Sequence, residues 1–221
     1  MKLRAPVRCV IFDMDGVLLD TEPIYTKVTN MIAAEHGKVF DWTVKADLIG
    51  RPALDSAEFL IEKLSLPITP EQYLAQRKPL LEELLAAADA VTGAEAFTRE
   101  LHRRNVPIGV ATSTDAPLFE IKTGRHRDWF SIFSTIVCGD HPRVLRGKPA
   151  PDIFLVTAEL MGVPPESCVV IEDSPNGLAA ALAAGMRAIG FPDPHMDRAR
   201  YANADFVVGS FAELTLGDLG F

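Results

Sequence analysis

The stretch VRCVIFDMDGVLLD, at residues 7–20, contains the pattern that decides the fold. Its apolar run, residues 7–12, is typical of a parallel strand that is buried on both faces of a sheet. Asp13, Asp15 and Gly16 follow this run directly. In open α/β sheets, ligands bind outside the carboxyl ends of the strands, so two carboxylates in a glycine turn at this point indicate a functional site. Taken alone, the two acids could also be solvated loop residues or helix caps.

Five more short apolar runs come later in the chain, and helical patterns lie between them. The runs cover residues 107–111, 132–138, 168–171, 188–191 and 206–208. Strands that alternate with helices in this way predict an α/β protein. We therefore expect a Rossmann-like, doubly wound parallel sheet with helices on both faces.

One region, residues 21–89, breaks this alternation because it shows only helical patterning. Three apolar stripes with helical spacing lie at residues 24–32, 57–64 and 73–88. Pro79 is expected to kink or restart the last of these helices. The sequence predicts an all-helical cap domain at residues 21–89, inserted after the first strand of a discontinuous α/β core at residues 1–20 and 90–221. A single α/β domain with a long first crossover is the alternative.

Two local patterns predict where helices begin. Thr92 and Glu95 match a capping box, which predicts the start of a helix just before Ala96. Ser174 followed by Pro175 predicts an N-cap with proline at the first helical position.

Three further polar clusters follow predicted strands or precede predicted helices. Thr112 and Ser113 come after the second apolar run, where small hydroxyls and backbone N–H groups can bind an anion. Lys148 lies in the segment GKPAPD before a helical pattern and can project as a cation. Glu172 and Asp173 come after the fourth run, as a second adjacent pair of acids. Each cluster alone has an ordinary explanation, namely a helix cap or a surface lysine.

Together, the clusters supply the groups that phosphoryl transfer needs. They provide a carboxylate nucleophile, a second carboxylate, hydroxyl donors, a lysine and a pair of metal-binding acids, all expected at one edge of the sheet. The five histidines show no metal-ligand spacing. Because the available ligands are hard oxygens, they favour Mg²⁺ over zinc.

The composition argues against several other classes of protein. The net charge is −8 over 221 residues, so we expect neither a nucleic-acid partner nor electrostatic binding to a membrane. No apolar stretch reaches the ~20 residues that a transmembrane helix needs, and the acids after residue 12 come too early for a signal peptide. The three cysteines are interpreted as free thiols, which indicates a cytoplasmic protein. The expected partner is a small-molecule phosphate ester, and the expected assembly is a monomer or a small homo-oligomer.

The motifs resemble those of the haloacid dehalogenase superfamily, in its phosphatase branch with an inserted helical cap. Residues 13–20, DMDGVLLD, are similar to the first motif of that superfamily. Thr112, Lys148 and the pair Glu172-Asp173 match its second, third and fourth motifs in order. The resemblance covers the whole chain.

The resemblance implies a role for each motif residue. Asp13 attacks phosphorus and becomes an aspartyl-phosphate. Asp15 protonates the leaving oxygen and then deprotonates the water that cleaves this intermediate. Thr112, with the backbone of Ser113, holds the transferring phosphoryl oxygens, and Lys148 screens the charge of the nucleophile and the phosphate.

The resemblance also implies Mg²⁺ as the cofactor. Its ligands would be Asp13, the backbone carbonyl of Asp15 and Asp173, with Glu172 bound directly or through water. Asp15 also favours the phosphatase branch of the superfamily over the dehalogenase branch, because the dehalogenases usually lack an acid at this position.

Residues of the cap are expected to select the substrate. Tyr25 and Arg51 are the candidates for substrate binding, although Arg51 could also be a solvated residue at a helix start. The β-phosphoglucomutases of the superfamily usually carry histidine in place of Tyr25, which argues against a mutase. The stretch 121–126 resembles the branch that dephosphorylates pseudouridine 5′-phosphate, so this compound or a sugar phosphate is the expected substrate. A phosphomutase and a non-catalytic phospho-acceptor or binding protein are the alternatives.

Overall fold

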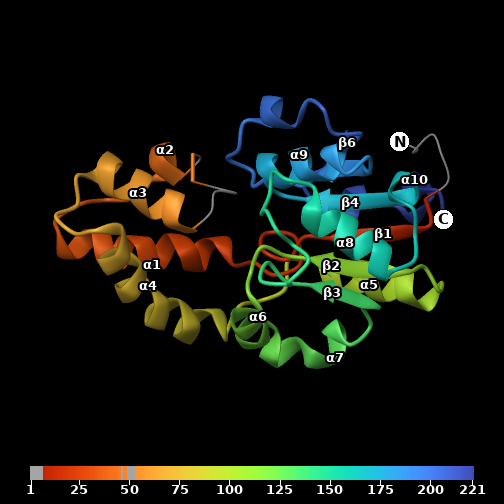
Figure 1. The fold of residues 1–221 in the computed structure, drawn as a ribbon, viewed down its shortest axis with the longest axis horizontal. Coiled ribbons are helices and arrows are strands. Elements are labelled where there is room, and N and C mark those ends of the chain that lie inside the picture. The colour runs from red at the N-terminus through yellow and green to blue at the C-terminus, as the bar shows by residue number, and fades with distance from the viewer. Residues whose placement is uncertain (1–6, 46, 49–52) are drawn as a thin grey trace.

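The computed structural model describes residues 7–45, 47–48 and 53–221, and a six-stranded parallel sheet lies at its centre (Figure 1). The strands are β1 (Cys9–Phe12), β2 (Ile108–Ala111), β3 (Thr135–Val137), β4 (Cys168–Glu172), β5 (Arg187–Gly190) and β6 (Phe206–Val207). Their order in the sheet is β3-β2-β1-β4-β5-β6. All six apolar runs that predicted strands form strands of this sheet, and the predicted fold class is confirmed. Because the strand order reverses beside β1, the carboxyl end of β1 lies where open α/β sheets bind ligands.

The sheet is covered on both faces because alternate side chains of each strand point to opposite sides. Val10 and Phe12 of β1 belong to one hydrophobic cluster, and Cys9 and Ile11 belong to the other. The helices that cover the first face are α5 (Ala94–Arg103), α6 (Ala116–Thr123), α7 (Arg127–Phe130) and α10 (Leu216–Leu219). The second face is covered by α8 (Asp152–Leu160) and α9 (Pro175–Ala183).

Four of the described helices that lie between β1 and β2 in the sequence pack together to one side of the sheet (Figure 1). They are α1 (Glu22–Glu35), α2 (Trp42–Lys45), α3 (Ala53–Leu64) and α4 (Pro70–Leu85). Their apolar faces form a third hydrophobic cluster, which includes Ile32, Leu60 and Leu85. Helix α4 continues through Pro79, so this proline does not restart the helix. The insertion of a helical cap after the first strand is therefore confirmed.

The chain enters and leaves this helical region through two adjacent segments. The backbone N–H of Asp20 donates to the carbonyl of Asp89 at 2.8 Å, and the N–H of Val91 donates to the carbonyl of Leu18 at 2.8 Å. Leu19 and Ala90 form an antiparallel bridge. We propose that these paired segments mark the boundaries of the cap domain predicted at residues 21–89.

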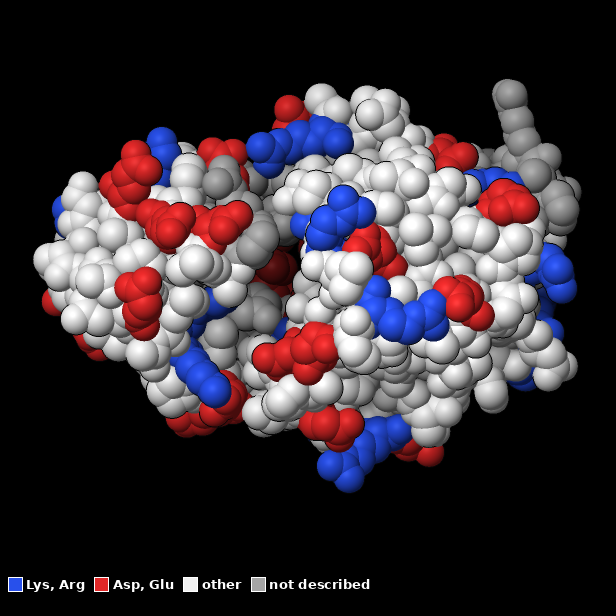
Figure 2. Space-filling view, viewed as in Figure 1, with Lys and Arg blue, Asp and Glu red and all other residues white. Residues whose placement is uncertain are grey.

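The cap also touches the core through α2. The indole Nε1 of Trp42 donates to the backbone carbonyl of His195 at 3.0 Å, and the two rings lie 4.9 Å apart, centre to centre. Nearby, the guanidinium of Arg200 lies 3.1 Å from a carboxylate oxygen of Asp47. A hollow separates the cap from the core on the face shown in Figure 2, where lysines and arginines are interspersed with acids.

The two predicted helix starts differ in outcome. Ser174 is the N-cap of α9, and its hydroxyl accepts a hydrogen bond from the N–H of Gly177 at 3.0 Å, as predicted. The predicted capping box at Thr92 is wrong. Gly93 takes the N-cap position in a left-handed conformation, with φ of 87°, so α5 begins at Ala94 and Thr92 lies outside the cap.

In the parts of the chain that the structure describes, no helix is both long enough and apolar enough to cross a membrane.

Candidate active site

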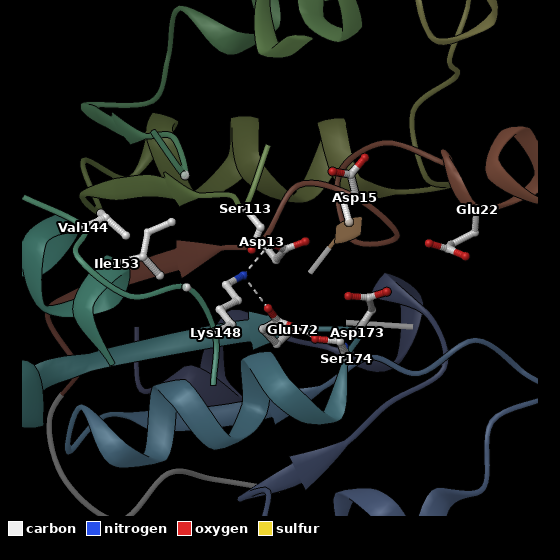
Figure 3. Close-up of a pocket in the computed structure, with 13 residues that line it drawn as sticks. Asp13, Asp15, Glu22, Ser113, Val144, Lys148, Ile153, Glu172, Asp173 and Ser174 are labelled. Atoms are coloured by element: carbon white, nitrogen blue, oxygen red, sulfur yellow. Dashed lines mark hydrogen bonds and ion pairs between the residues drawn. The ribbon is translucent and has the colours of Figure 1, made fainter. Parts of the chain in front are cut away.

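Three carboxylates gather at the carboxyl ends of β1 and β4. Asp13 follows β1, Glu172 ends β4, and Asp173 comes next in the chain (Figure 3). One ligand atom from each residue lies within 4.8 Å of the others. The N–H of Asp13 donates to the carbonyl of Ile171 at 3.0 Å, which continues the pairing of β1 with β4 and brings the acids together.

Lys148 joins two of these carboxylates. Its Nζ donates to Asp13 Oδ1 at 2.6 Å and to Glu172 Oε1 at 2.5 Å (Figure 3). A third hydrogen bond reaches the carbonyl of Ala111, at the end of β2, at 3.2 Å. Burial alone would lower the pKa of Lys148, but the charges of Asp13 and Glu172 outweigh it and raise the pKa, so the ammonium stays charged. The lysine predicted from the sequence therefore lies against the predicted nucleophile.

The cluster contains more negative than positive charge. Burial, with the charges of Glu172 and Asp15, outweighs Lys148 and raises the pKa of Asp13 to about 7. Burial and the neighbouring Glu172 also raise the pKa of Asp173. Three acids beside one ammonium are unfavourable in a buried site unless a cation joins them. The donor set consists of hard oxygens, so these residues fit a divalent cation such as Mg²⁺.

Two glycines allow the acids to approach the backbone. Gly16 has a φ of +77°, and a Cβ at this residue would clash with the carboxylate of Asp173. A Cβ at Gly177, in the first turn of α9, would overlap the carboxylate of Glu172. The second oxygen of Glu172 accepts hydrogen bonds from the N–H and the hydroxyl of Ser174, at 2.8 and 2.9 Å. Glu172 is thus fixed by its neighbours before any ligand binds.

Thr112 and Ser113 lie beside the acids, after β2. Thr112 is fully buried, and its hydroxyl oxygen accepts a hydrogen bond from the N–H of Thr114 at 3.1 Å. The hydroxyl is the acceptor in this bond, so the bond does not use the hydroxyl proton. Ser113 lines the cavity that contains Asp13 and Lys148, whereas Thr112 is not among the residues that line it. The predicted role of both residues in holding phosphoryl oxygens stays a prediction.

Two adjoining cavities open beside the cluster. The first has a volume of about 330 Å³ and is lined by Asp13, Lys148 and the acids after β4. The second, about 410 Å³, lies under the cap. The residues that line both cavities are Asp15, Glu22, Ala53 and Ser113. Because Asp15 lines both cavities, a ligand that occupied both of them would pass beside its carboxylate.

The side chain of Asp15 points away from the other acids (Figure 3). Its two oxygens lie 2.7 Å from Lys122 Nζ and accept further hydrogen bonds from the hydroxyls of Thr21, at 2.7 Å, and Thr114, at 2.9 Å. Burial would raise the pKa of Asp15, but Lys122 and these hydroxyls together lower it. The metal role predicted for Asp15 concerned its backbone carbonyl and stays a prediction.

Lys122 is a residue that the sequence analysis did not select. It is fully buried on α6, and its Nζ also donates to the hydroxyls of Tyr25 and Thr114 at 2.8 Å each. Its spacing in the sequence could have indicated a buried lysine. Lys122 lies three residues after Phe119 and four after Leu118, which places it on the apolar side of the helix.

The two predicted substrate residues of the cap differ in outcome. Tyr25 lines the second cavity, and burial followed by the charge of Asp15 raises its pKa to about 12. Arg51 lies outside the described residues, so its prediction is untested. Arg77 of α4 lines the same cavity and was not predicted.

Comparisons with known proteins agree with this geometry. A family described as haloacid dehalogenase-like hydrolase matches residues 7–185. A probable pseudouridine-5′-phosphatase of Drosophila melanogaster is 44% identical over 214 residues, which cover 96% of this chain and 92% of that protein. The (DL)-glycerol-3-phosphatase 2 of Arabidopsis thaliana is 39% identical over 215 residues, which cover 95% of this chain and 90% of that protein.

A solved structure gives the same result for the fold. The crystal structure of CbbY from Rhodobacter sphaeroides in complex with phosphate has a TM-score of 0.79 and 28% sequence identity, and it covers 97% of this chain and 100% of that one. The resemblance inferred from the four motifs is thereby confirmed. The chain belongs to the haloacid dehalogenase-like hydrolase family and is a phosphatase of that family.

Proposed function

We propose that this phosphatase is a magnesium-dependent phosphomonoester hydrolase that forms a phospho-aspartate on Asp13. One observation carries the proposal. Asp13 is buried beside Lys148 and two further acids in one cavity, and Asp15 lines both this cavity and the adjoining one under the cap. A phosphoryl group in the first cavity would leave the rest of the ester in the second.

The reaction would proceed in two steps. A carboxylate oxygen of Asp13 attacks phosphorus, the bond from phosphorus to the ester oxygen breaks, and Asp15 gives a proton to the departing alcohol. Water then attacks phosphorus and gives a proton to Asp15, and the carboxylate of Asp13 is released with inorganic phosphate. Lys148 offsets negative charge throughout, and Thr112 with Ser113 holds the phosphoryl oxygens.

Asp13, Glu172 and Asp173, with the backbone carbonyl of Asp15, would hold Mg²⁺. When bound, the ion supplies positive charge that stabilises the phosphoryl oxygens. The support for this assignment is the buried cluster itself, where three carboxylates face one ammonium.

The substrate would be a small phosphorylated metabolite. Pseudouridine 5′-phosphate and glycerol 3-phosphate are the first candidates, because relatives at 44% and 39% identity are named for these activities. Tyr25 lies in the cap cavity, where the part of the substrate beyond the phosphate would bind. Tyr25 is therefore proposed to select the ester. Arg51 is proposed to do so on the sequence alone, and Tyr25→His and Arg51→Ala should change kcat/KM unequally across substrates. We place the activity in the cytoplasm, supported by three free cysteines.

The test is phosphate release from p-nitrophenyl phosphate, pseudouridine 5′-phosphate and glycerol 3-phosphate, with Mg²⁺ and with EDTA. Turnover that requires both Mg²⁺ and Asp13 is the expected result. A phosphomutase would instead return isomerised sugar phosphate, and a binding protein would release no phosphate. Either of these outcomes would replace the proposal.

A further inference from the structure

The three acids of the proposed metal site are held in different ways. The carboxylates of Asp13 and Glu172 each accept a hydrogen bond from Lys148, and Glu172 is also bonded to Ser174. The carboxylate of Asp173, by contrast, makes no hydrogen bond and no ion pair with any residue that the structure describes. Its direction therefore depends on the backbone that carries it.

The backbone is fixed on both sides of Asp173. Before it, the carbonyl of Glu172 accepts a hydrogen bond from the N–H of Phe191 at 2.7 Å. After it, the N–H of Ser174 donates to the carboxylate of Glu172 at 2.8 Å, and the hydroxyl of Tyr201 donates to the carbonyl of Asp173. Because a peptide group is planar, these last two bonds hold the peptide between Asp173 and Ser174 at both of its polar ends.

Tyr201 is rigidly placed for this contact. It ends the 3₁₀ helix η3 (Arg198–Tyr201), is fully buried, and belongs to the second core cluster. Its ring lies against β5 at Gly190, where a Cβ would come within 2.8 Å of a ring carbon. A buried hydroxyl needs a hydrogen-bond partner, and the carbonyl of Asp173 is the one that the described residues supply. The ring thus has little room to move, and the position of the hydroxyl is set by the core.

A cation site is sensitive to such positioning. One ligand atom from each of Asp13, Glu172 and Asp173 lies within 4.8 Å of the others, so their charges repel one another when no cation lies between them. A carboxylate that was free to turn would turn away from the cluster. Mg²⁺ also demands nearly ideal octahedral geometry. A fixed backbone at Asp173 therefore favours binding, because the ligand does not have to be reoriented.

We propose that Tyr201 is a positioning residue of the metal site. By holding the carbonyl of Asp173, its hydroxyl keeps the carboxylate of Asp173 directed at the cation that Asp13 and Glu172 share. Tyr201 touches neither the ion nor the substrate and acts only through Asp173. The inference rests on the proposed function, since it requires that the three acids bind a divalent cation.

Tyr201→Phe tests the proposal because it removes the hydroxyl and keeps the ring. Tyr73→Phe is the matched control, since Tyr73 is also buried and its hydroxyl shares a hydrogen bond of 3.1 Å with Thr29 in the cap. Mn²⁺ is the probe, because it accepts the same oxygen ligands and is paramagnetic. It is titrated into each full-length protein without substrate, and the free ion is measured by electron paramagnetic resonance. This measurement does not depend on turnover.

The dissociation constant for Mn²⁺ should rise about 10–100-fold in Tyr201→Phe, the usual effect of removing a group that orients a metal ligand, and should not change in Tyr73→Phe. With p-nitrophenyl phosphate, Tyr201→Phe should need correspondingly more Mg²⁺, while saturating Mg²⁺ restores kcat and KM stays the same. A hydroxyl that only stabilised the fold would give a different result. Its loss would lower kcat through the smaller folded fraction and leave the affinity of the folded protein for Mn²⁺ unchanged.

A double variant shows whether Tyr201 acts through Asp173. In a chain that carries Asp173→Ala, adding Tyr201→Phe should not weaken Mn²⁺ binding further, because the carboxylate to be positioned is gone. Equal weakening in both backgrounds, an equal loss in Tyr73→Phe, or unchanged affinity in Tyr201→Phe would overturn this inference and leave the proposed function intact. If the unaltered protein bound no Mn²⁺, the metal assignment of the proposed function would fail, and this inference would fail with it.

Discussion

Lys122 Nζ lies 2.7 Å from both carboxylate oxygens of Asp15, and this buried ion pair joins α6 to the turn that follows β1. Lys122 is inaccessible to solvent, and the side chain of Asp15 is 21% exposed. Because the same ammonium also contacts Tyr25 of α1, one cation links the core, the proposed acid/base and the cap. Removing it would leave a partly buried carboxylate without its counter-charge.

We therefore predict that Lys122→Met destabilises the protein by about 3–5 kcal/mol, the usual cost of removing one partner of a buried pair. The free energy of unfolding in urea measures this effect. Lys122→Met combined with Asp15→Asn should cost less than the sum of the two single variants, since the double variant leaves no unpaired charge. Lys78→Met, which removes an exposed lysine, serves as the control. Strictly additive costs would show that the pair is not energetically coupled.

Asp13→Asn should reduce phosphate release to background while the protein stays folded. An amide has nearly the shape of the carboxylate but is a very poor nucleophile. Phosphate release and the circular dichroism spectrum are the two measurements. Near-normal turnover in a preparation free of other phosphatases would remove Asp13 from the mechanism.

Asp15→Asn should slow turnover by roughly 10²–10⁴-fold, the range that general acid–base catalysis usually supplies. Because Asp15 lines both cavities, its loss should affect both the departure of the alcohol and the attack of water. Acid quenching after reaction with a ³²P-labelled substrate detects any labelled aspartate that accumulates. Turnover equal to that of the unchanged protein would refute the acid/base assignment.

Turnover should vanish in EDTA and return with Mg²⁺, and zinc should restore it poorly. The reason is charge, because one ammonium cannot offset Asp13, Glu172, Asp173 and an incoming phosphate dianion. In Asp173→Asn, more Mg²⁺ should be needed for half-maximal activity. A titration of activity against Mg²⁺ compares the two proteins, and full activity of either in excess chelator would contradict a metal requirement.

The polar clusters of the core were predictable from the sequence because their positions follow from strand order. Asp13, Thr112 and Glu172 each occur at or directly after the end of a parallel strand, and carboxyl ends of parallel strands meet at one edge of a sheet. The apolar run that precedes each of these residues was therefore enough to predict its position at that edge of the sheet. The register of the sheet, with Phe12 opposite both Val110 and Ile171, brings the three ends level.

The cap cavity was harder to predict because its residues meet only through tertiary packing. Arg77 lies on α4, Tyr25 on α1 and Lys122 on α6, and no short-range pattern states which faces of these helices will meet. Patterns of neighbouring residues also fail to predict a helix start where the backbone conformation determines it. The capping-box pattern at Thr92 was overridden by the left-handed conformation of Gly93, which residue spacing alone does not reveal.

The contact between Trp42 and His195 gives the molecule an internal optical reporter. The chain has two tryptophans, and the other, Trp129, is only 2% exposed inside the first core cluster. Trp42 instead lies where the cap meets the core, against an imidazole ring and a backbone carbonyl. Any movement of α2 away from His195 changes the surroundings of one indole and leaves the other unchanged. Fluorescence emission from Trp42, recorded against the constant signal of Trp129, therefore reads the position of the cap without an added label.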